Sequence, residues 1–273
     1  MNMKQFKNIY FLSLLLFVHA EGFDFQSSGF KGSVGSFGLT ELSPSENLSF
    51  LNGFNNRNSF SIESGYSREY QLSKLDNIFI AALVNKKKIS YAIGISQFGN
   101  SGFYSERISK LAVAYTFKNL SLGTYFSLLS INFGYKYEGI NSKAVGFSLS
   151  GKLNYLTLAF SADNINSPKY NGRSIGDNPT YTIYADLTGK PGHTLLASVR
   201  MEEFEKPRFA VMQENRLSDL AKISLKVSTA PLVYGGGLKM KYKKQEIIYF
   251  LSFHNILGLS HGISFIYSLG KDD

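Results

Sequence analysis

Large apolar residues recur at every second position along much of this chain, and this period restricts the fold more than any other feature. In one segment, Ile89, Tyr91, Ile93 and Ile95 alternate with Ser90, Ala92, Gly94 and Ser96. The same alternation returns in 60–67, 111–117, 145–150, 156–161, 223–227 and 263–269. Successive side chains of a β-strand point to opposite faces, so this period predicts strands with one large, apolar face.

Turn residues between these segments delimit about fourteen strands. We expect them near 58–68, 77–85, 88–98, 109–118, 119–137, 143–151, 153–164, 180–189, 192–202, 207–213, 220–229, 231–242, 245–254 and 260–270. Long connections at 68–77, 99–109 and 165–180 alternate with tight ones at 86–87, 118–119, 152 and 190–191. Long loops at one end and short turns at the other are typical of outer-membrane barrels. The alternation fails between Glu202 and Asp219, where a count of twelve strands is the alternative.

Composition separates the remaining fold classes. The mean hydropathy of -0.08 excludes a polytopic helical membrane protein, and the longest uninterrupted apolar run, Ile78 to Val84, is far too short for a spanning helix. The absence of cysteine excludes disulfide scaffolds and thiol chemistry. Ser, Ala, Gly and Thr dominate the face opposite the large residues, which suits a narrow barrel interior. The sequence therefore predicts an all-β, antiparallel transmembrane barrel, with a secreted soluble β-sandwich as the alternative.

The N-terminal residues predict export. Lys4 and Lys7 precede the apolar stretch Ile9 to Val18, and Val18-His19-Ala20 suits signal-peptide cleavage after Ala20. Residues 21–57 differ from the strands that follow: Ser43-Pro44-Ser45-Glu46 reads as a helix start, predicting a short helix that plugs or lines the barrel mouth, or lies on the surface. We expect a signal peptide at 1–20, a lumen segment at 21–57 and the barrel domain at 58–273.

No motif predicts an enzyme, a metal site or a cofactor. His193, His254 and His261 lack metal-ligand spacing, the Asp163-Asn164 pair reads as a turn, and Glu202, Glu203 and Glu205 read as a solvated loop.

Four lysines form the one polar feature of interest, since they lie on the small-residue faces of two neighbouring strands: Lys222, Lys226, Lys239 and Lys241. Inside a barrel they form a basic lumen wall for an anionic solute. The alternative is that they are solvated at strand ends or paired with acidic residues. Nucleic acid is not an expected partner of an exported chain.

Three segments resemble the PorV/PorQ family of outer-membrane barrels, which is related to FadL-type transporters of hydrophobic solutes. Tyr249 to Gly270 is similar to the family's closing strands, and Phe160 to Ile165 is similar to a strand end that precedes a long loop. Ser45 to Phe54 resembles the family's N-terminal Asn-Pro-Ala-Gly element, although Asn52 is followed directly by Gly53. The resemblance implies a barrel of about fourteen strands and makes Asn52 a candidate lumen residue.

The predicted function is therefore that of an outer-membrane barrel in contact with outer-membrane lipid. The resemblance implies either transport of a hydrophobic or amphipathic anionic solute, or a role in type IX secretion or surface attachment with secretion-system proteins as partners. A general porin is the alternative within the same fold, and it predicts a wide, charged lumen.

Overall fold

The computed structural model describes residues 43–44, 48, 59–72, 76–100, 102, 104–134, 139–167, 169–170, 173–174, 179–188, 192–202 and 206–270. The predicted signal peptide at 1–20, most of the predicted lumen segment at 21–57 and the candidate residue Asn52 lie outside these residues. Within them, no helix is long and apolar enough to cross a membrane.

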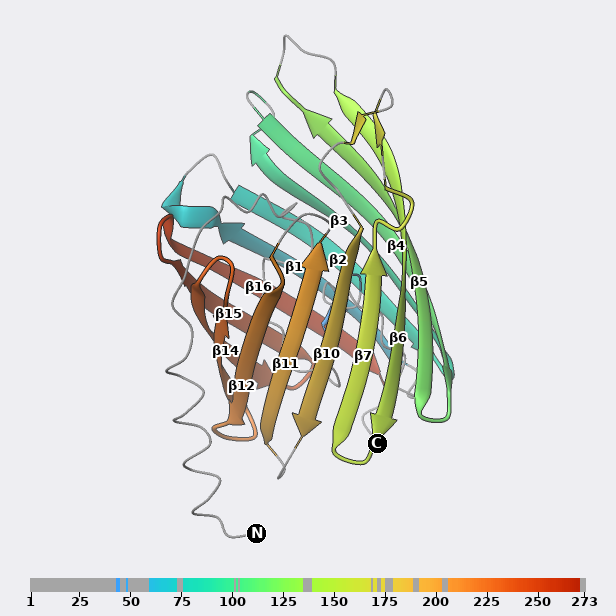
Figure 1. Cartoon of the computed structure of the whole chain (residues 1–273). Helices are drawn as coiled ribbons and strands as arrows, with labels where there is room; N and C mark the ends of the chain where they lie inside the picture. The colour runs from blue at the N-terminus through green and yellow to red at the C-terminus, as the bar shows by residue number, and fades with distance from the viewer. Residues whose placement is uncertain are drawn as a thin grey trace.

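The described chain forms one closed antiparallel barrel of fourteen strands, in which β1 pairs with β16 (Figure 1). Its strands are β1 (Ser59–Arg68), β2 (Asp76–Lys86), β3 (Ile89–Asn100), β4 (Tyr104–Phe117), β5 (Leu120–Asn132), β6 (Ile140–Leu153), β7 (Leu156–Asp163), β10 (Thr180–Thr188), β11 (His193–Glu202), β12 (Arg208–Arg216), β13 (Ala221–Ser228), β14 (Val233–Tyr242), β15 (Gln245–His254) and β16 (Gly258–Gly270). A 3₁₀ turn, η1 (Glu69–Gln71), follows β1, and a two-stranded hairpin of β8 (Lys169–Tyr170) and β9 (Arg173–Ser174) lies between β7 and β10.

The barrel confirms the predicted strand number and excludes the two alternatives. The sheet has fourteen strands, so the alternative of twelve is wrong. It is a single closed sheet, which excludes the two packed sheets of a sandwich. The region where loop alternation failed resolves into β11, β12 and a tight connection at 217–220. The expected long loop at 99–109 is wrong, because β4 already begins at Tyr104.

The two ends of the barrel differ in their connections. At the lower end in Figure 1, short turns join β2 to β3, β4 to β5, β6 to β7, β10 to β11, β12 to β13 and β14 to β15. The start of β1 and the end of β16 lie at this same end, since Ser59 pairs with both Gly270 and Asn85. We call it the short-turn end. The opposite end carries η1 and the β8–β9 hairpin, and we call it the loop end.

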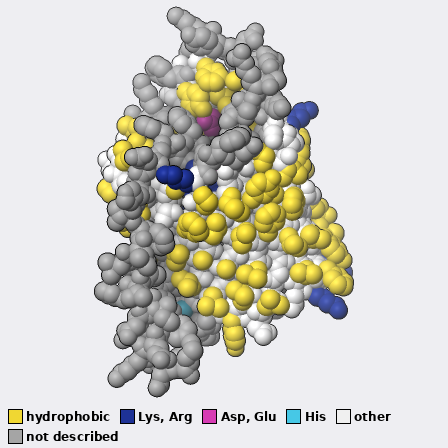
Figure 2. All heavy atoms as spheres, viewed as in Figure 1, with side chains coloured by type: hydrophobic (Ala, Val, Ile, Leu, Met, Phe, Trp, Pro, Cys, Tyr) yellow, Lys and Arg dark blue, Asp and Glu magenta, His cyan; other side chains and the backbone are white. Residues whose placement is uncertain are grey.

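The outer face of the barrel is apolar. Figure 2 shows hydrophobic side chains spread over the side of the barrel in view. Around the barrel, the exposed apolar residues include Ile93 at 57% exposed, Leu122 at 60% and Leu225 at 61%. Ile93 and Leu122 have large cross-strand neighbours on the same face, Leu111 and Leu149, so the exposed residues there form continuous apolar area. The predicted outward direction of the large faces is confirmed.

The inner face carries larger side chains and more charged groups than the sequence predicted. Phe79, Leu83, Tyr125, Ile248 and Phe250 point inward and are buried. The run from Ile78 to Val84 shows no alternation because β2 is apolar on both faces: Phe79, Ala81 and Leu83 are buried, whereas Ile78 and Ile80 are exposed.

Three inward aromatic rings each cover a glycine that is their direct cross-strand partner. Phe79 covers Gly65, Tyr125 covers Gly146 and Phe250 covers Gly262, and the register pairs the same residues. A Cβ atom at any of these glycines would come within 2.3 Å of the ring. The glycines therefore provide the space in which large side chains lie flat against the wall.

Leu48 lies among these inward side chains. Pro44 and Leu48 have helical backbone conformation, and Leu48 is 0% exposed. It belongs to one buried apolar cluster with Phe79, Tyr125 and Ile248. At least this residue of the predicted short helix thus packs against the inner wall.

Candidate functional site

The four lysines predicted to form a basic lumen wall lie on β13 and β14, in the register of the inner face. Lys222 and Lys239 are direct cross-strand neighbours, and Lys226 is opposite Gly235. Like charges placed directly opposite one another are destabilising unless acidic groups lie close by. We call Lys222, Lys226, Lys239 and Lys241 the basic wall.

Glutamates on the two flanking strands supply these acidic groups. The Nζ atom of Lys222 donates to Oε1 of Glu214 on β12 at 3.1 Å. On the other side, Glu246 of β15 lies 2.9 Å from Lys239 Nζ and 3.5 Å from Lys241 Nζ. The predicted alternative of pairing with acidic residues therefore holds for these three lysines.

A second charged group on the inner face was not predicted. Lys110 of β4 and Asp163 of β7 are both buried, and their Nζ and Oδ1 atoms lie 3.8 Å apart. The hydroxyl of Tyr125, on the intervening strand β5, donates to Asp163, and Lys110 Nζ lies 3.8 Å from the centre of the Tyr125 ring. We call Lys110, Tyr125 and Asp163 the lumen triad.

Two sequence interpretations are corrected by this arrangement. Asp163 is an inward residue at the end of β7 rather than a turn residue, although Asn164 does take the turn conformation with φ of 55°. Glu202 is not in a solvated loop, because it ends β11 and forms an ion pair with Arg200. The signal for Asp163 was its even spacing from Thr157, Ala159 and Ser161, which places it on the small-residue face.

The basic wall meets the apolar cluster at one pair of residues. Lys239 on β14 is the direct cross-strand partner of Ile248 on β15. Lys239 is 7% exposed and Ile248 is 0% exposed, and Ile248 belongs to the cluster that contains Leu48. The inner surface thus has an apolar part around β2, β5, β15 and β16 that adjoins a basic part on β13 and β14.

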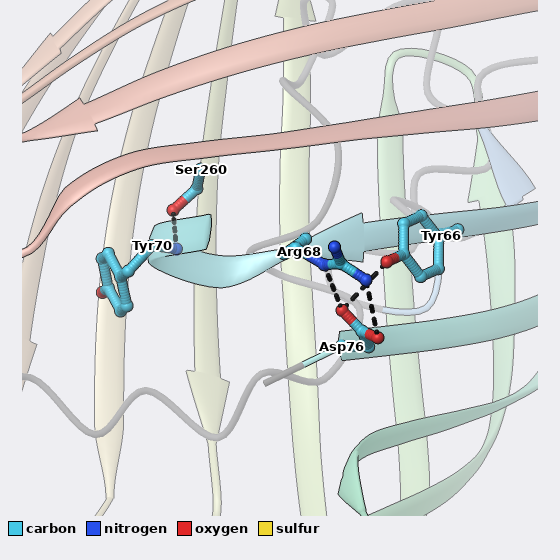
Figure 3. A network of polar contacts seen from close by, with 5 residues as sticks. All are labelled: Tyr66, Arg68, Tyr70, Asp76 and Ser260. Carbon is cyan, nitrogen blue, oxygen red and sulfur yellow. Dashed lines mark hydrogen bonds and ion pairs between the residues drawn. The ribbon is translucent and has the colours of Figure 1, made fainter. Parts of the chain in front are cut away.

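A polar network joins β1, β2, η1 and β16 at the loop end (Figure 3). Asp76 accepts a hydrogen bond from the hydroxyl of Tyr66 at 2.9 Å and two from the Arg68 guanidinium, at 2.8 and 3.3 Å. The backbone N–H of Tyr70 donates to Oγ of Ser260 at 2.9 Å. The bonds to Asp76 tie the end of β1 to β2, and the Tyr70 bond holds η1 against β16. Burial raises the pKa of the neighbouring Glu69 carboxyl, and a hydrogen bond with Ser260 opposes that rise.

His254 has a structural role at the turn between β15 and β16. Nδ1 of His254 accepts hydrogen bonds from the backbone N–H groups of Ile256 and Leu257, both at 3.1 Å, so the imidazole shapes the β15–β16 turn. The Tyr70 ring packs edge-on against it. Among the residues that the structure describes, no group of His, Asp and Glu has the arrangement of a metal site.

Comparison with known proteins shows no family. No protein-family model matches the chain, and no curated protein is similar to it in sequence. A triple mutant of Rhodopseudomonas blastica porin is 7% identical, with a TM-score of 0.47, over 77% of this chain and 99% of that chain. The KdgM porin in complex with disordered oligogalacturonate is 10% identical, with a TM-score of 0.45, over the same shares. The resemblance to the PorV/PorQ family and the absence of enzymatic activity both stay predictions.

Proposed function

We propose that this protein is an outer-membrane β-barrel. The supporting observation is the inversion of its faces, because apolar side chains cover the outside while serine, threonine and charged groups line much of the inside. The outward side chains of β6 from Val145 to Leu153 extend about 27 Å along the strand at ~3.4 Å per residue, or about 20 Å along the membrane normal at a ~40° tilt. That height is near the ~25 Å apolar band of outer-membrane barrels.

The location is tested by cell fractionation and gel migration. We expect the chain in the outer-membrane fraction, with faster migration in unheated than in heated gel samples, because a closed barrel resists detergent at room temperature. Recovery of the chain as a soluble periplasmic protein would contradict the proposal.

We further propose that the barrel passes an amphipathic, anionic solute of the kind expected from the FadL-type resemblance. The observation that supports this is the junction of Lys239 and Ile248, where a basic surface adjoins an apolar one. A carboxylate at the basic wall and a hydrocarbon tail along the apolar cluster match the two surfaces. Leu48 occupies the apolar part, so we propose that its side chain limits passage.

Proteoliposomes with the full chain test this function. We expect labelled dodecanoate, added at alkaline pH where the anion predominates, to enter faster than into protein-free vesicles, without swelling in sucrose. Leu48→Ala should increase the dodecanoate rate because it opens the apolar part. The matched substitution Leu158→Ala, on the outer face of β7, should leave the rate unchanged. Swelling in sucrose would favour the general porin instead, and the absence of any flux would contradict a transport role.

A further inference from the structure

The short-turn end of the barrel carries a ring of basic residues. Its turns and the strand ends beside them contribute Lys86, Lys87 and Lys88, then Lys118, Lys152, Arg216, Lys243 and Lys244. Within the described turns of this end, 87–88, 118–119, 154–155, 217–220 and 243–244, the acidic residue is Asp219, which is held 2.6 Å from Arg216. The ring is therefore strongly positive.

Lysine occupies turn positions where other residues fold at lower cost. Lys87, Lys118 and Lys243 have φ of 55°, 53° and 53°, in the left-handed region that glycine and asparagine adopt most readily. The matching position of the β6–β7 turn holds Asn154, with φ of 49°. Backbone geometry alone favours asparagine at all four turns, so the lysines point to a requirement for positive charge.

The apolar outer face extends as far as these turns. Phe117 and Leu120, each 54% exposed, flank the β4–β5 turn, and Tyr242, 62% exposed, precedes the β14–β15 turn. The Nζ atoms of Lys118 and Lys243 lie 5.5 and 5.3 Å from the centres of the Phe117 and Tyr242 rings. Each ammonium group thus sits at the edge of the apolar belt, which is the depth of lipid headgroups.

The outer face at the loop end has a different character. There Arg68 is bonded to Asp76, and Arg107 donates to Gln97 at 3.1 Å. Within the described part of the chain, Lys118, Lys152, Lys243 and Lys244 form no such ion pair with an acidic side chain. At the loop end a carboxylate thus compensates the charge of Arg68, whereas the charges of these four lysines are presented to the surroundings.

We propose that the basic ring binds the phosphates of anionic phospholipids in the leaflet that surrounds the short-turn end. The inference rests on the proposed membrane location. In outer-membrane barrels the short turns face the periplasm, so the leaflet is the periplasmic one. The ring positions the barrel at a fixed depth and concentrates phosphatidylglycerol-type lipids around it.

Binding of defined lipids to the full chain tests this proposal. The barrel is inserted into nanodiscs of phosphatidylcholine with a small fraction of phosphatidylglycerol, and the lipids that remain bound after release are counted by native mass spectrometry. The test variant is Lys118→Asn with Lys243→Asn, because asparagine suits the left-handed turn and preserves the fold. The matched control is Arg107→Gln with Lys143→Gln, which removes the same charge from exposed residues toward the loop end.

We expect the unaltered chain to retain phosphatidylglycerol over phosphatidylcholine, with the preference weakened in high salt. The preference for phosphatidylglycerol over phosphatidylcholine should fall about tenfold in the turn variant and stay unchanged in the control variant. Insertion without any lipid preference, or equal loss in both variants, would overturn this inference and leave the membrane location standing. Failure of the unaltered chain to insert even into phosphatidylcholine would overturn both. Tighter binding of soluble poly-glutamate than of phosphatidylglycerol would assign the ring to an acidic polymer and overturn the lipid proposal.

Discussion

The ring of Phe79 lies flat on Gly65, its direct partner on the neighbouring strand, and leaves no room for a Cβ atom there. Tyr125 with Gly146 and Phe250 with Gly262 repeat the relationship. Because both residues of each pair come from adjacent strands, the pairs also fix strand register. A slip by two residues, which keeps the side chains on their faces, would place the Phe79 ring opposite Glu63 or Ser67, where a larger side chain takes the space.

Gly146→Ala tests this packing. The new Cβ would come within 2.3 Å of the Tyr125 ring, so we expect a loss of about 1–3 kcal/mol in the free energy of unfolding, as for other overpacked sites. Urea unfolding in detergent micelles, followed by circular dichroism, measures it. Gly151→Ala on the same strand is the control, since its Cβ would meet only Leu120 Cδ2 at 3.4 Å. Equal effects of the two substitutions would contradict the packing role.

The ion pair of Lys239 and Glu246 allows a double-mutant cycle. Glu246→Gln leaves Lys239 and Lys241 without their shared carboxylate, and we expect it to destabilise the barrel by about 1–3 kcal/mol. Adding Lys239→Met should recover part of the loss, because the like charge opposite Lys222 disappears with it. Strictly additive losses in the cycle would show that the pair is not coupled.

The lumen triad should behave as one unit. Asp163→Asn removes the carboxylate that faces both Lys110 and Tyr125, so we expect a loss of about 2–4 kcal/mol from a buried ammonium group without its counter-charge. Combining it with Lys110→Met should restore most of the stability in the same urea assay. Exposed Asp219→Asn is the control and should change stability by less than about 1 kcal/mol. No recovery of stability in the double variant would show that Lys110 and Asp163 do not act as one unit.

Stability near η1 should depend on pH through Glu69. Burial places the pKa of the folded-state carboxyl above its unfolded value, so the folded protein binds this proton more tightly. Below the unfolded pKa, the Glu69 carboxyl is protonated in both states and its burial does not oppose folding. This stability is lost as pH rises through the folded pKa, because the buried carboxyl then ionises. We expect Glu69→Gln to raise stability at neutral pH and to have no such effect in strong acid. A uniform effect across the pH range in urea titrations would contradict the assignment.

The sequence by itself predicted the strands and their outward faces, because alternation and turn residues are local properties of the chain. It left their number open between fourteen and twelve, and the closed sheet decided for fourteen. Ile93 and Leu225 point outward, as their period predicted.

Only the tertiary structure decided which inward side chains contact one another. Asp163 reaches Tyr125 and Lys110 from other strands, and Leu48 joins Phe79 and Ile248, only because the sheet closes with a particular register. Closure is a non-local property, and a period of two does not encode which inward residues face each other. For the same reason the lysines of the basic wall were placed correctly on the inner face by their period, whereas their glutamate partners on β12 and β15 became evident only from strand pairing.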